Sequence, residues 1–344
     1  MGFCGGLLRM LHGVAGLALC VSVMNLCPSA ASAETIKIGL FKGISAGGPI
    51  YIAMDRGYFA AEGLDAQLLF FDAGEPIAVA TVSGDVDFGA AGISAGLYNL
   101  AAQGALRVIG GMNRDVPGFH AVGFFASKRA FAAGVTSMKN FAGHTSGITT
   151  VGSTYHYTLG LLEEKAQIDP KSVRVVPLQG MPNIMSALTG EQVDTAVLPI
   201  PLAAPAVQRG DFKLLGYTSD EAPWQMGLIW TSTKTADHDS DRVQRFLRAY
   251  RKGGHDYFAA FTAPDGSSRL GDGSDDILKI IAKYTSQTVA QIKPALSYDD
   301  PDGRLDEADV ANQVAWFHAQ DMVKSTIDTS RLIDQRYALP IAAH

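Results

Sequence analysis

The chain has 344 residues and a net charge of −6 at pH 7. A mildly acidic chain is a poor candidate for binding nucleic acid or an anionic membrane surface, because like charges repel. All three cysteines, Cys4, Cys20 and Cys27, lie near the N-terminus. The remainder of the chain therefore contains no disulfide, thiolate nucleophile or cysteine metal site.

The first 33 residues predict a signal peptide. They contain Arg9 but no acidic residue, have a long apolar middle, and end in Ala31-Ser32-Ala33, a pattern typical of a signal-peptidase site. We therefore expect export and cleavage after Ala33; losing Arg9 changes the net charge from −6 to −7. An uncleaved membrane anchor is the alternative, which the small and polar residues from Asn25 onward disfavour because they shorten the apolar run.

The 311 residues that remain (344 − 33) suffice for one large domain or two of ordinary size. Their first part alternates between strand and helix patterns, which indicates βαβ units and a mostly parallel sheet. Strands are expected over residues 35–41, 64–71, 86–91 and 106–112, and helices over residues 48–63, 74–84 and 93–104.

One segment is nearly repeated. The stretches that begin at Gly74 and Gly180 both read Gly-x-Pro, an apolar helix, Ser or Thr with Gly, and then Val-Asp before a short buried strand. The period is too long for a solenoid and suits two lobes of similar topology. From about Ser240 the chain reads as helices, over 241–261, 274–285, 289–296 and 307–323, which we expect to buttress the first lobe.

In the second lobe, a β-branched strand over residues 145–151 runs into a helix in the stretch GSTYHYTLGLLEEK. Ser153 stands at the N-cap position, and Tyr155 and Leu159 begin an apolar helix face. A tight turn between a strand and a helix leaves several backbone N–H groups without partners. Such donors suit a small ligand with an anionic or strongly accepting group.

Four turns at carboxyl ends of strands are expected to line one cleft between the lobes, because open α/β sheets bind ligands at that edge. They are residues 41–49 and 90–96 in the first lobe and 151–157 and 198–203 in the second.

The mature chain resembles the bacterial periplasmic substrate-binding proteins of the sulfonate, taurine, nitrate and thiamine-pyrimidine type. The segments that carry the resemblance are IYIAMDRGYFAAEGLDAQL, SGDVDFGAAGISAGL, GSTYHYTLGLLEEKAQIDP, MSALTGEQVDTAVLPIPLAA and, in the tail, IAKYT and DPDGRLDEADVANQVAWF. The resemblance implies the type II periplasmic-binding fold: an α/β protein of two similar lobes of mostly parallel sheet with flanking helices and a helical C-terminal tail.

The implied organisation is a first part of lobe 1 over residues 34–113, lobe 2 over 114–221, and a return to lobe 1 with the C-terminal helices over 222–344. The resemblance also implies a periplasmic monomer that binds a small solute, closes over it and docks on the membrane permease of an ABC importer, without a cofactor. Hinges are expected near residues 112–117 and 217–223. The family's contacts carry over to Ser45, Ala46, Gly47, Ile93, Ser94, Gly152, Ser153, Thr154, Tyr155, Pro199, Ile200 and Pro201.

These four turns contain no acidic residue, so we expect an organic anion, a carboxylate or sulfonate with a flat or apolar body. Lys42 and Arg114 are the candidate cations, although Arg114 could equally form a surface ion pair. Tyr155, Tyr217 and Trp224 could stack on an aromatic ring, although Tyr155 also fits a core position. A neutral heterocycle such as a pyrimidine is the alternative, because free N–H groups also suit carbonyl and ring-nitrogen acceptors.

Two enzyme readings compete with solute binding. The stretch GISAG at residues 92–96 matches the nucleophile elbow G-x-S-x-G with Ser94 as nucleophile, but the motif is short and composed of common residues. A pyrimidine-forming enzyme of the same fold is disfavoured by the signal peptide and by a mature chain without cysteine. No metal site is expected, because no two histidines have zinc-site spacing. His156 could touch ligand or pack against its own lobe.

Overall fold

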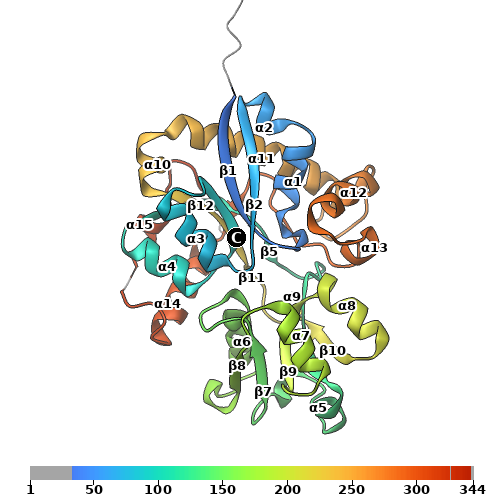
Figure 1. Ribbon diagram of the computed structural model, residues 1–344. Coiled ribbons are helices and arrows are strands. Elements are labelled where there is room, and N and C mark those ends of the chain that lie inside the picture. The colour runs from blue at the N-terminus through green and yellow to red at the C-terminus, as the bar shows by residue number, and fades with distance from the viewer. Residues whose placement is uncertain (1–32, 326, 342–344) are drawn as a thin grey trace, which may run out of the picture. The chain divides into compact units, whose positions relative to one another are not determined.

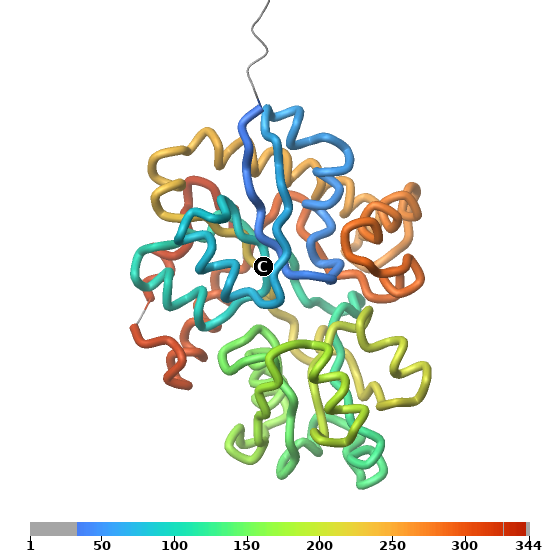
Figure 2. Tube along the Cα trace, in the orientation of Figure 1, coloured from blue at the N-terminus to red at the C-terminus, as the bar shows by residue number. Residues whose placement is uncertain are grey.

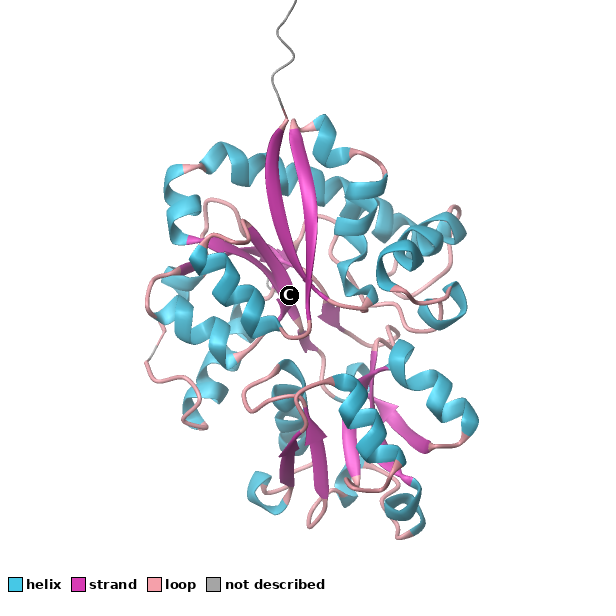
Figure 3. Cartoon of the chain, in the orientation of Figure 1, coloured by secondary structure: helices cyan, strands magenta, loops and turns pink. Residues whose placement is uncertain are grey.

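The computed structural model describes residues 33–325 and 327–341, which form two α/β lobes (Figure 1). Each lobe is built on a five-stranded sheet flanked by helices (Figure 3). Within these described residues, no helix is both long and apolar enough to cross a bilayer. The alternation of strands and helices expected from the sequence is confirmed.

The two sheets have the same topology. In lobe 1 the strand order is β2-β1-β3-β12-β4, and in lobe 2, read from the opposite edge, it is β8-β7-β9-β6-β10. The lobe 1 strands are β1 (Glu34–Phe41), β2 (Leu64–Phe71), β3 (Phe88–Gly92), β4 (Leu106–Gly111) and β12 (Gly227–Ser232). The lobe 2 strands are β6 (Val122–Ser127), β7 (Thr145–Ile148), β8 (Arg174–Pro177), β9 (Thr195–Pro199) and β10 (Phe212–Tyr217).

One strand in each sheet runs against the other four. In lobe 1 it is β12, antiparallel to β3 and β4, and in lobe 2 it is β6, antiparallel to β9 and β10. Both are the strands on which the chain arrives from the other lobe. A strand that enters through the edge where its neighbours end must run in the opposite direction. The reversed strands therefore follow from the crossings.

The crossings themselves form a two-stranded antiparallel ribbon of β5 (Arg114–Asp115) and β11 (Trp224–Gln225). Figure 2 shows the result in colour: lobe 2 is a single run from green to yellow, whereas lobe 1 combines blue with orange and red. Lobe 2 is thus an insertion into lobe 1, joined to it by two neighbouring strands.

Helices cover both sheets. Lobe 1 has α1 (Gly48–Asp55), α2 (Tyr58–Ala61), α3 (Gly74–Ser83) and α4 (Ala95–Ala102), and lobe 2 has α5 (Lys128–Ala132), α6 (Thr154–Lys165), α7 (Met181–Thr189), α8 (Ile200–Arg209) and α9 (Thr218–Glu221). The C-terminal part has α10 (Thr233–His238), α11 (Ser240–Phe261), α12 (Ser274–Thr285), α13 (Val289–Ile292), α14 (Glu307–Ala319) and α15 (Thr329–Leu332), with a small sheet of β13 (Arg304–Leu305) and β14 (Leu339–Pro340). The single helix expected over 48–63 is two helices, because Gly57 adopts a left-handed conformation (φ 71°) between them.

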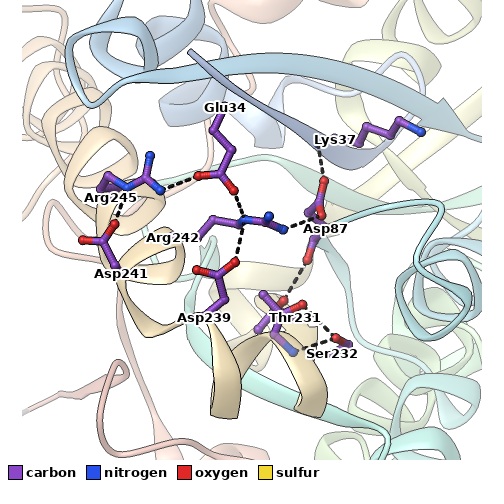
Figure 4. Close-up of polar contacts among 10 residues, drawn as sticks. Glu34, Lys37, Asp87, Thr231, Ser232, Asp239, Asp241, Arg242 and Arg245 are labelled. Atoms are coloured by element: carbon purple, nitrogen blue, oxygen red, sulfur yellow. Dashed lines mark hydrogen bonds and ion pairs between the residues drawn. The ribbon is translucent and has the colours of Figure 1, made fainter. Parts of the chain in front are cut away.

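An ion-pair network fastens the start of β1 to α11 (Figure 4). Glu34 accepts hydrogen bonds from Arg242 and Arg245, and Arg242 also reaches Asp87 (3.2 Å). Burial opposes ionisation of Glu34, but the two arginines hold the pKa of Glu34 below its usual range. The first strand of the sheet is therefore held in register at its outer end.

The C-terminal helix α14 contacts both lobes. On the lobe 1 side, its Gln313 accepts a hydrogen bond from Tyr98 of α4 (2.6 Å) and donates to the backbone of Gln225 in β11 (2.7 Å). On the lobe 2 side, Trp316 packs edge-on against Tyr157 of α6 with ring centres 5.2 Å apart. The expected buttress of lobe 1 therefore also holds lobe 2.

Helices α1 and α11 approach so closely that a side chain cannot fit between them. A Cβ on Gly253 of α11 would overlap the carbonyl oxygen of Pro49. Glycine is otherwise unfavourable inside a helix by about 1 kcal/mol relative to alanine, so its presence here reflects the close packing.

We predict that Gly253→Ala destabilises the protein by about 1–3 kcal/mol, although Gly→Ala normally strengthens a helix, because the new methyl group would force the two helices apart. Gln244→Ala, at an exposed position of α11, is the control and should change stability by less than about 0.5 kcal/mol. Urea denaturation measures both. A Gly253→Ala variant as stable as the wild type would contradict this account.

Candidate functional site

The carboxyl ends of the strands in both lobes border two cavities between the lobes. The larger, which we call the outer cavity, has a volume of about 830 Å³. It is lined in lobe 1 by the end of β1, the β2–α3 turn, the exposed side of α3 and the N-terminus of α4. In lobe 2 it is lined by the turn after β7 and the N-termini of α6 and α7. The lining residues are Phe41, Phe70, Phe71, Asp72, Ala73, Gly74, Glu75, Pro76, Val79, Ala80, Ser83, Asp85, Ser94, Thr149, Thr150, Ser153, Thr154, Tyr155, Gln179 and Met181.

The smaller, inner cavity has a volume of about 40 Å³ and lies near the crossing strands. It is bordered by the loop after β1, the residue before β5, the turn after β9 and two segments of the C-terminal part. The lining residues are Ile44, Ser45, Ala46, Asn113, Ala121, Val122, Tyr155, Pro199, Pro201, Met226, Gln287 and Ser297.

Tyr155 lines both cavities. It is the second residue of α6, and its half-buried ring lies at the boundary between the outer and the inner space. The outer and inner cavities therefore adjoin at this side chain, and we call them together the interlobe cleft.

The lobes touch directly beside this cleft. The Thr154 hydroxyl donates to the carbonyl oxygen of Ile93 (2.8 Å), and the Ala95 N–H donates to the carbonyl oxygen of Gly152 (2.9 Å). Two glycines allow the approach. A Cβ on Gly92 would lie 2.5 Å from Thr154 Oγ1, and one on Gly152, which has φ +80°, would lie 2.8 Å from Ala95 Cβ. We call these two hydrogen bonds the interlobe latch.

The N-terminus of α6 has the cap expected from the sequence. The Ser153 hydroxyl accepts the N–H of His156 (3.4 Å). Among the described residues, none accepts the N–H of Thr154 or Tyr155, so these two first-turn donors are available beside the outer cavity. His156 lines neither cavity: Gly152 N–H donates to its Nδ1 (3.0 Å), and its ring lies edge-on to Trp316 of α14. Burial lowers the pKa of His156 to about 4. The imidazole is therefore neutral.

The charges around the cleft differ from those expected. Asp72, Glu75 and Asp85 line the outer cavity, and within the described part of the chain no Lys, Arg or His lines either cavity. Lys42 is exposed and lines neither cavity. Arg114 lies on β5 and pairs with Asp306 of the C-terminal part, with Nη2 and Oδ2 3.4 Å apart, which matches the ion-pair alternative.

The candidate residues as a whole divide into three groups. Ser94, Ser153, Thr154 and Tyr155 line the outer cavity, and Ser45, Ala46, Pro199, Pro201 and again Tyr155 line the inner one. Lys42, Gly47, Ile93, Arg114, Gly152, Ile200 and Trp224 line neither.

The two remaining aromatic candidates, Trp224 and Tyr217, line neither cavity. Trp224 is 1% exposed and packs against Tyr157 with ring centres 5.0 Å apart. Tyr217 stacks on His120 at 3.8 Å. In this conformation both rings pack against other side chains of the protein.

Sequence reasoning missed several lining residues. Asp72 and Glu75 follow β2, and Thr149 and Thr150 follow β7, so the rule that ligands meet the carboxyl ends of strands points to them as well. Gln287 is different, because it lies between α12 and α13 in the C-terminal part, and no local pattern marks it.

The surroundings of Ser94 do not favour the hypothesis that it is the nucleophile of a G-x-S-x-G elbow. The Ser94 hydroxyl caps α4 by accepting the N–H of Leu97 (3.2 Å). None of the described residues that line either cavity is a histidine, so the histidine that this motif requires does not share a cavity with Ser94. Nor do the described residues include a group of three or more His, Cys, Asp or Glu side chains placed to hold a metal ion.

A carboxyl group is buried in the crossing ribbon. Asp115 of β5 is fully buried and accepts a hydrogen bond from the Thr218 hydroxyl, while its Oδ1 has no partner among the described residues. Burial raises the pKa of Asp115 to about 7, against the lowering effect of the Thr218 hydrogen bond. The joint between the lobes thus contains a group that changes charge near neutral pH.

Residues 46–265 match the family model described as NMT1/THI5 like. No curated protein shows significant similarity to the chain.

Solved structures share its fold. The alkanesulfonate-binding protein from Xanthomonas axonopodis pv. citri bound to MOPS is 17% identical, with 88% of this chain and 99% of that chain covered and a TM-score of 0.66. The periplasmic nitrate-binding protein from Synechocystis PCC 6803 is 12% identical, with 86% and 84% covered and a TM-score of 0.64. A Candida albicans protein with the generic periplasmic binding protein structural fold is 13% identical, with 90% and 99% covered and a TM-score of 0.69. The expected periplasmic-binding fold is therefore confirmed.

We predict that Gly152→Ala opens the protein in the absence of solute. The added methyl group meets Ala95 and strains a left-handed residue, so the latch should separate. Gly84→Ala is the matched control, because Gly84 has φ +86° and open space around it. Small-angle scattering should give a larger radius of gyration for Gly152→Ala only. Equal radii for all three proteins would show that the latch does not hold the lobes together.

We predict that Asp115→Asn changes the pH dependence of stability. Because its folded pKa lies above that of an unfolded aspartate, the native protein binds more protons between about pH 4 and 7. Wild-type stability should therefore fall across this window by up to about 1.4 kcal/mol per pH unit from this group. The Asn variant lacks this contribution.

Urea denaturation from pH 4 to 8 should show the stability of Asp115→Asn rising relative to wild type up to about pH 7 and then levelling. Asp272→Asn, at an exposed turn, should track the wild type throughout. Parallel curves for Asp115→Asn and wild type would show that the pKa of Asp115 is not raised in the folded protein.

Proposed function

Because the chain belongs to the NMT1/THI5-like family, we propose that it is the solute-binding component of an ABC importer. A small solute is bound between the two lobes and released unchanged to a membrane permease. The observation that carries this proposal is the outer cavity of about 830 Å³, within the range of cavities that hold small molecules. Its lining comes from both lobes, so a solute in it would bridge them.

The compartment follows from the same proposal. The protein is exported to the periplasm, its first 33 residues are removed after Ala33, and it acts as a monomer that the permease recognises in its closed form. Hinge bending occurs near residues 112–117 and 217–223, where the chain passes between the sheets. The names of two structural neighbours, an alkanesulfonate-binding and a nitrate-binding protein, support the transport role.

The solute is neutral and polar in our proposal, rather than the organic anion expected from the acid-free turns. An anion in the outer cavity would meet Asp72, Glu75 and Asp85 without a cation among the described lining residues to offset them. The free N–H groups of Thr154 and Tyr155 suit a carbonyl or ring-nitrogen acceptor as well as they suit an anion. Phe70, with 41% of its surface exposed, offers an apolar wall. A neutral heterocycle meets these conditions.

A thermal-shift panel tests the proposal. It should contain pyrimidines and other neutral heterocycles, amides, carboxylates, sulfonates and nitrate. A solute present at ~100 times its dissociation constant should stabilise the protein by roughly 2.7 kcal/mol. A best solute that is a carboxylate or sulfonate would restore the anion hypothesis, and a panel with no binder would count against solute binding.

We predict that Val79→Trp weakens binding of the best solute at least tenfold. Val79 is 52% exposed on α3 and lines the outer cavity, so a larger side chain there fills the cavity without disturbing the core. Val82→Trp is the matched control, since Val82 is 41% exposed on the same helix but outside the cavity. Calorimetry should show near wild-type affinity for Val82→Trp. Equal affinities for the two variants would place the solute elsewhere.

A further inference from the structure

Two buried amide side chains, Gln287 and Asn113, line the inner cavity, and the oxygen of each lacks a hydrogen-bond partner within the described part of the chain. Gln287 is 7% exposed and Asn113 is 1% exposed, and both line this cavity. Gln287 Oε1 and Asn113 Oδ1 have no hydrogen-bond partner among the described residues. Leaving a buried acceptor unpaired costs about 1–3 kcal/mol, so two such groups in one small cavity indicate a partner from outside the chain.

The orientation of Gln287 is determined by its neighbour. Its Nε2 donates to the carbonyl oxygen of Gly43 (3.0 Å). A carbonyl oxygen can only accept, so the amide nitrogen must face Gly43 and Oε1 must be the free end. Asn113 is held by a weaker contact, from Nδ2 to the sulfur of Met226 (3.4 Å). Gln287 is therefore the better-defined member of the pair.

The rest of the inner cavity is uncharged. Ser45, Pro199 and Pro201 border it, and none of its described lining residues carries a charge. A carboxylate or sulfonate would face two carbonyl oxygens there, which is repulsive. A cation would lose its hydration to two neutral acceptors only, which is costly. A neutral N–H group suits both acceptors and avoids either penalty.

The size of the cavity limits the group further. About 40 Å³ is far below the roughly 300–1,000 Å³ of pockets that hold whole small molecules, so only a small end group of a solute can enter. A terminal NH₂ group fits this space, while the body of the solute would extend past Tyr155 into the outer cavity.

We infer that Gln287, with Asn113, selects solutes that present a neutral NH₂ group, as in a primary amide, to the inner end of the cleft. This inference rests on the proposed solute-binding function and names the residues that decide specificity within it. Gln287 lies outside the segment that matches the family model, residues 46–265. The C-terminal part would then contribute to recognition as well as to support.

Calorimetry on the mature protein with matched probes tests the inference. Each set contains a primary amide, its N,N-dimethyl amide and the parent carboxylate: benzamide, N,N-dimethylbenzamide and benzoate, and the corresponding compounds of nicotinic and hexanoic acid. The primary amide should bind at least tenfold more tightly than the other two in every set that binds. A dimethyl amide or carboxylate that binds as tightly as its primary amide would overturn the inference and leave solute binding intact.

A variant locates the effect. Gln287→Met keeps the length of the side chain but removes both the free acceptor and the donor to Gly43. Loss of the acceptor should weaken the primary amide at least tenfold and leave the dimethyl amide unchanged, whereas loss of the Gly43 contact alone would weaken both. Gln244→Met, at an exposed site of α11, should bind both like wild type. Equal binding of the primary amide to wild type and Gln287→Met would overturn the role of Gln287. The wild-type ranking of the probes decides the solute class even if Gln287→Met does not fold.

Failure of the inference and failure of the proposed function remain distinguishable. If none of the nine probes binds but another solute of the thermal-shift panel does, the inner acceptors do not set the solute class. That result would contradict the inference and leave the proposed solute-binding function intact. If nothing in either set binds, the proposed function falls with it.

Discussion

The antiparallel pairing of β5 with β11 is the constraint from which the architecture of the protein follows. Over residues 33–325 the chain passes between the two sheets on these two neighbouring strands, so the carboxyl ends of both sheets border the same cleft. The same passage accounts for the one reversed strand in each sheet. Asp115 in this ribbon is buried without a full set of partners, so the joint also carries an electrostatic cost.

Much of the fold could be predicted from the sequence because its signals are local. The strand at Leu64–Phe71 and the cap at Ser153 depend on residues close together in the chain. The antiparallel direction of β12 could not be predicted from local signals, because it depends on the passage of the chain through lobe 2 between β4 and β12. The break at Gly57 was missed because apolar periodicity continues across it, while the turn depends on one residue's φ angle.

The candidate site was predictable only as far as strand ends mark it. Ser94, Thr154 and Tyr155 follow strands and line the cleft. The acidic residues Asp72 and Glu75 come from the β2–α3 turn, which was not among the four turns predicted to form the cleft. Gln287 lines the inner cavity although it lies in the C-terminal part, and its hydrogen-bond partner Gly43 is distant in sequence. No local pattern could therefore mark it. The sequence left the role of Arg114 open between a ligand contact and an ion pair, because its partner Asp306 is also distant in sequence.

The position of β12 has a consequence for the order of folding. This strand lies between β3 and β4 in the lobe 1 sheet, yet it follows all of lobe 2 along the chain. Lobe 2 has its five strands in one continuous stretch and can complete its sheet as soon as residue 217 is available. Until β12 arrives, β3 and β4 lack their common neighbour, and unpaired edges of this kind favour aggregation. Lobe 2 should therefore complete its sheet before lobe 1, whose sheet is completed only when β12 inserts between β3 and β4.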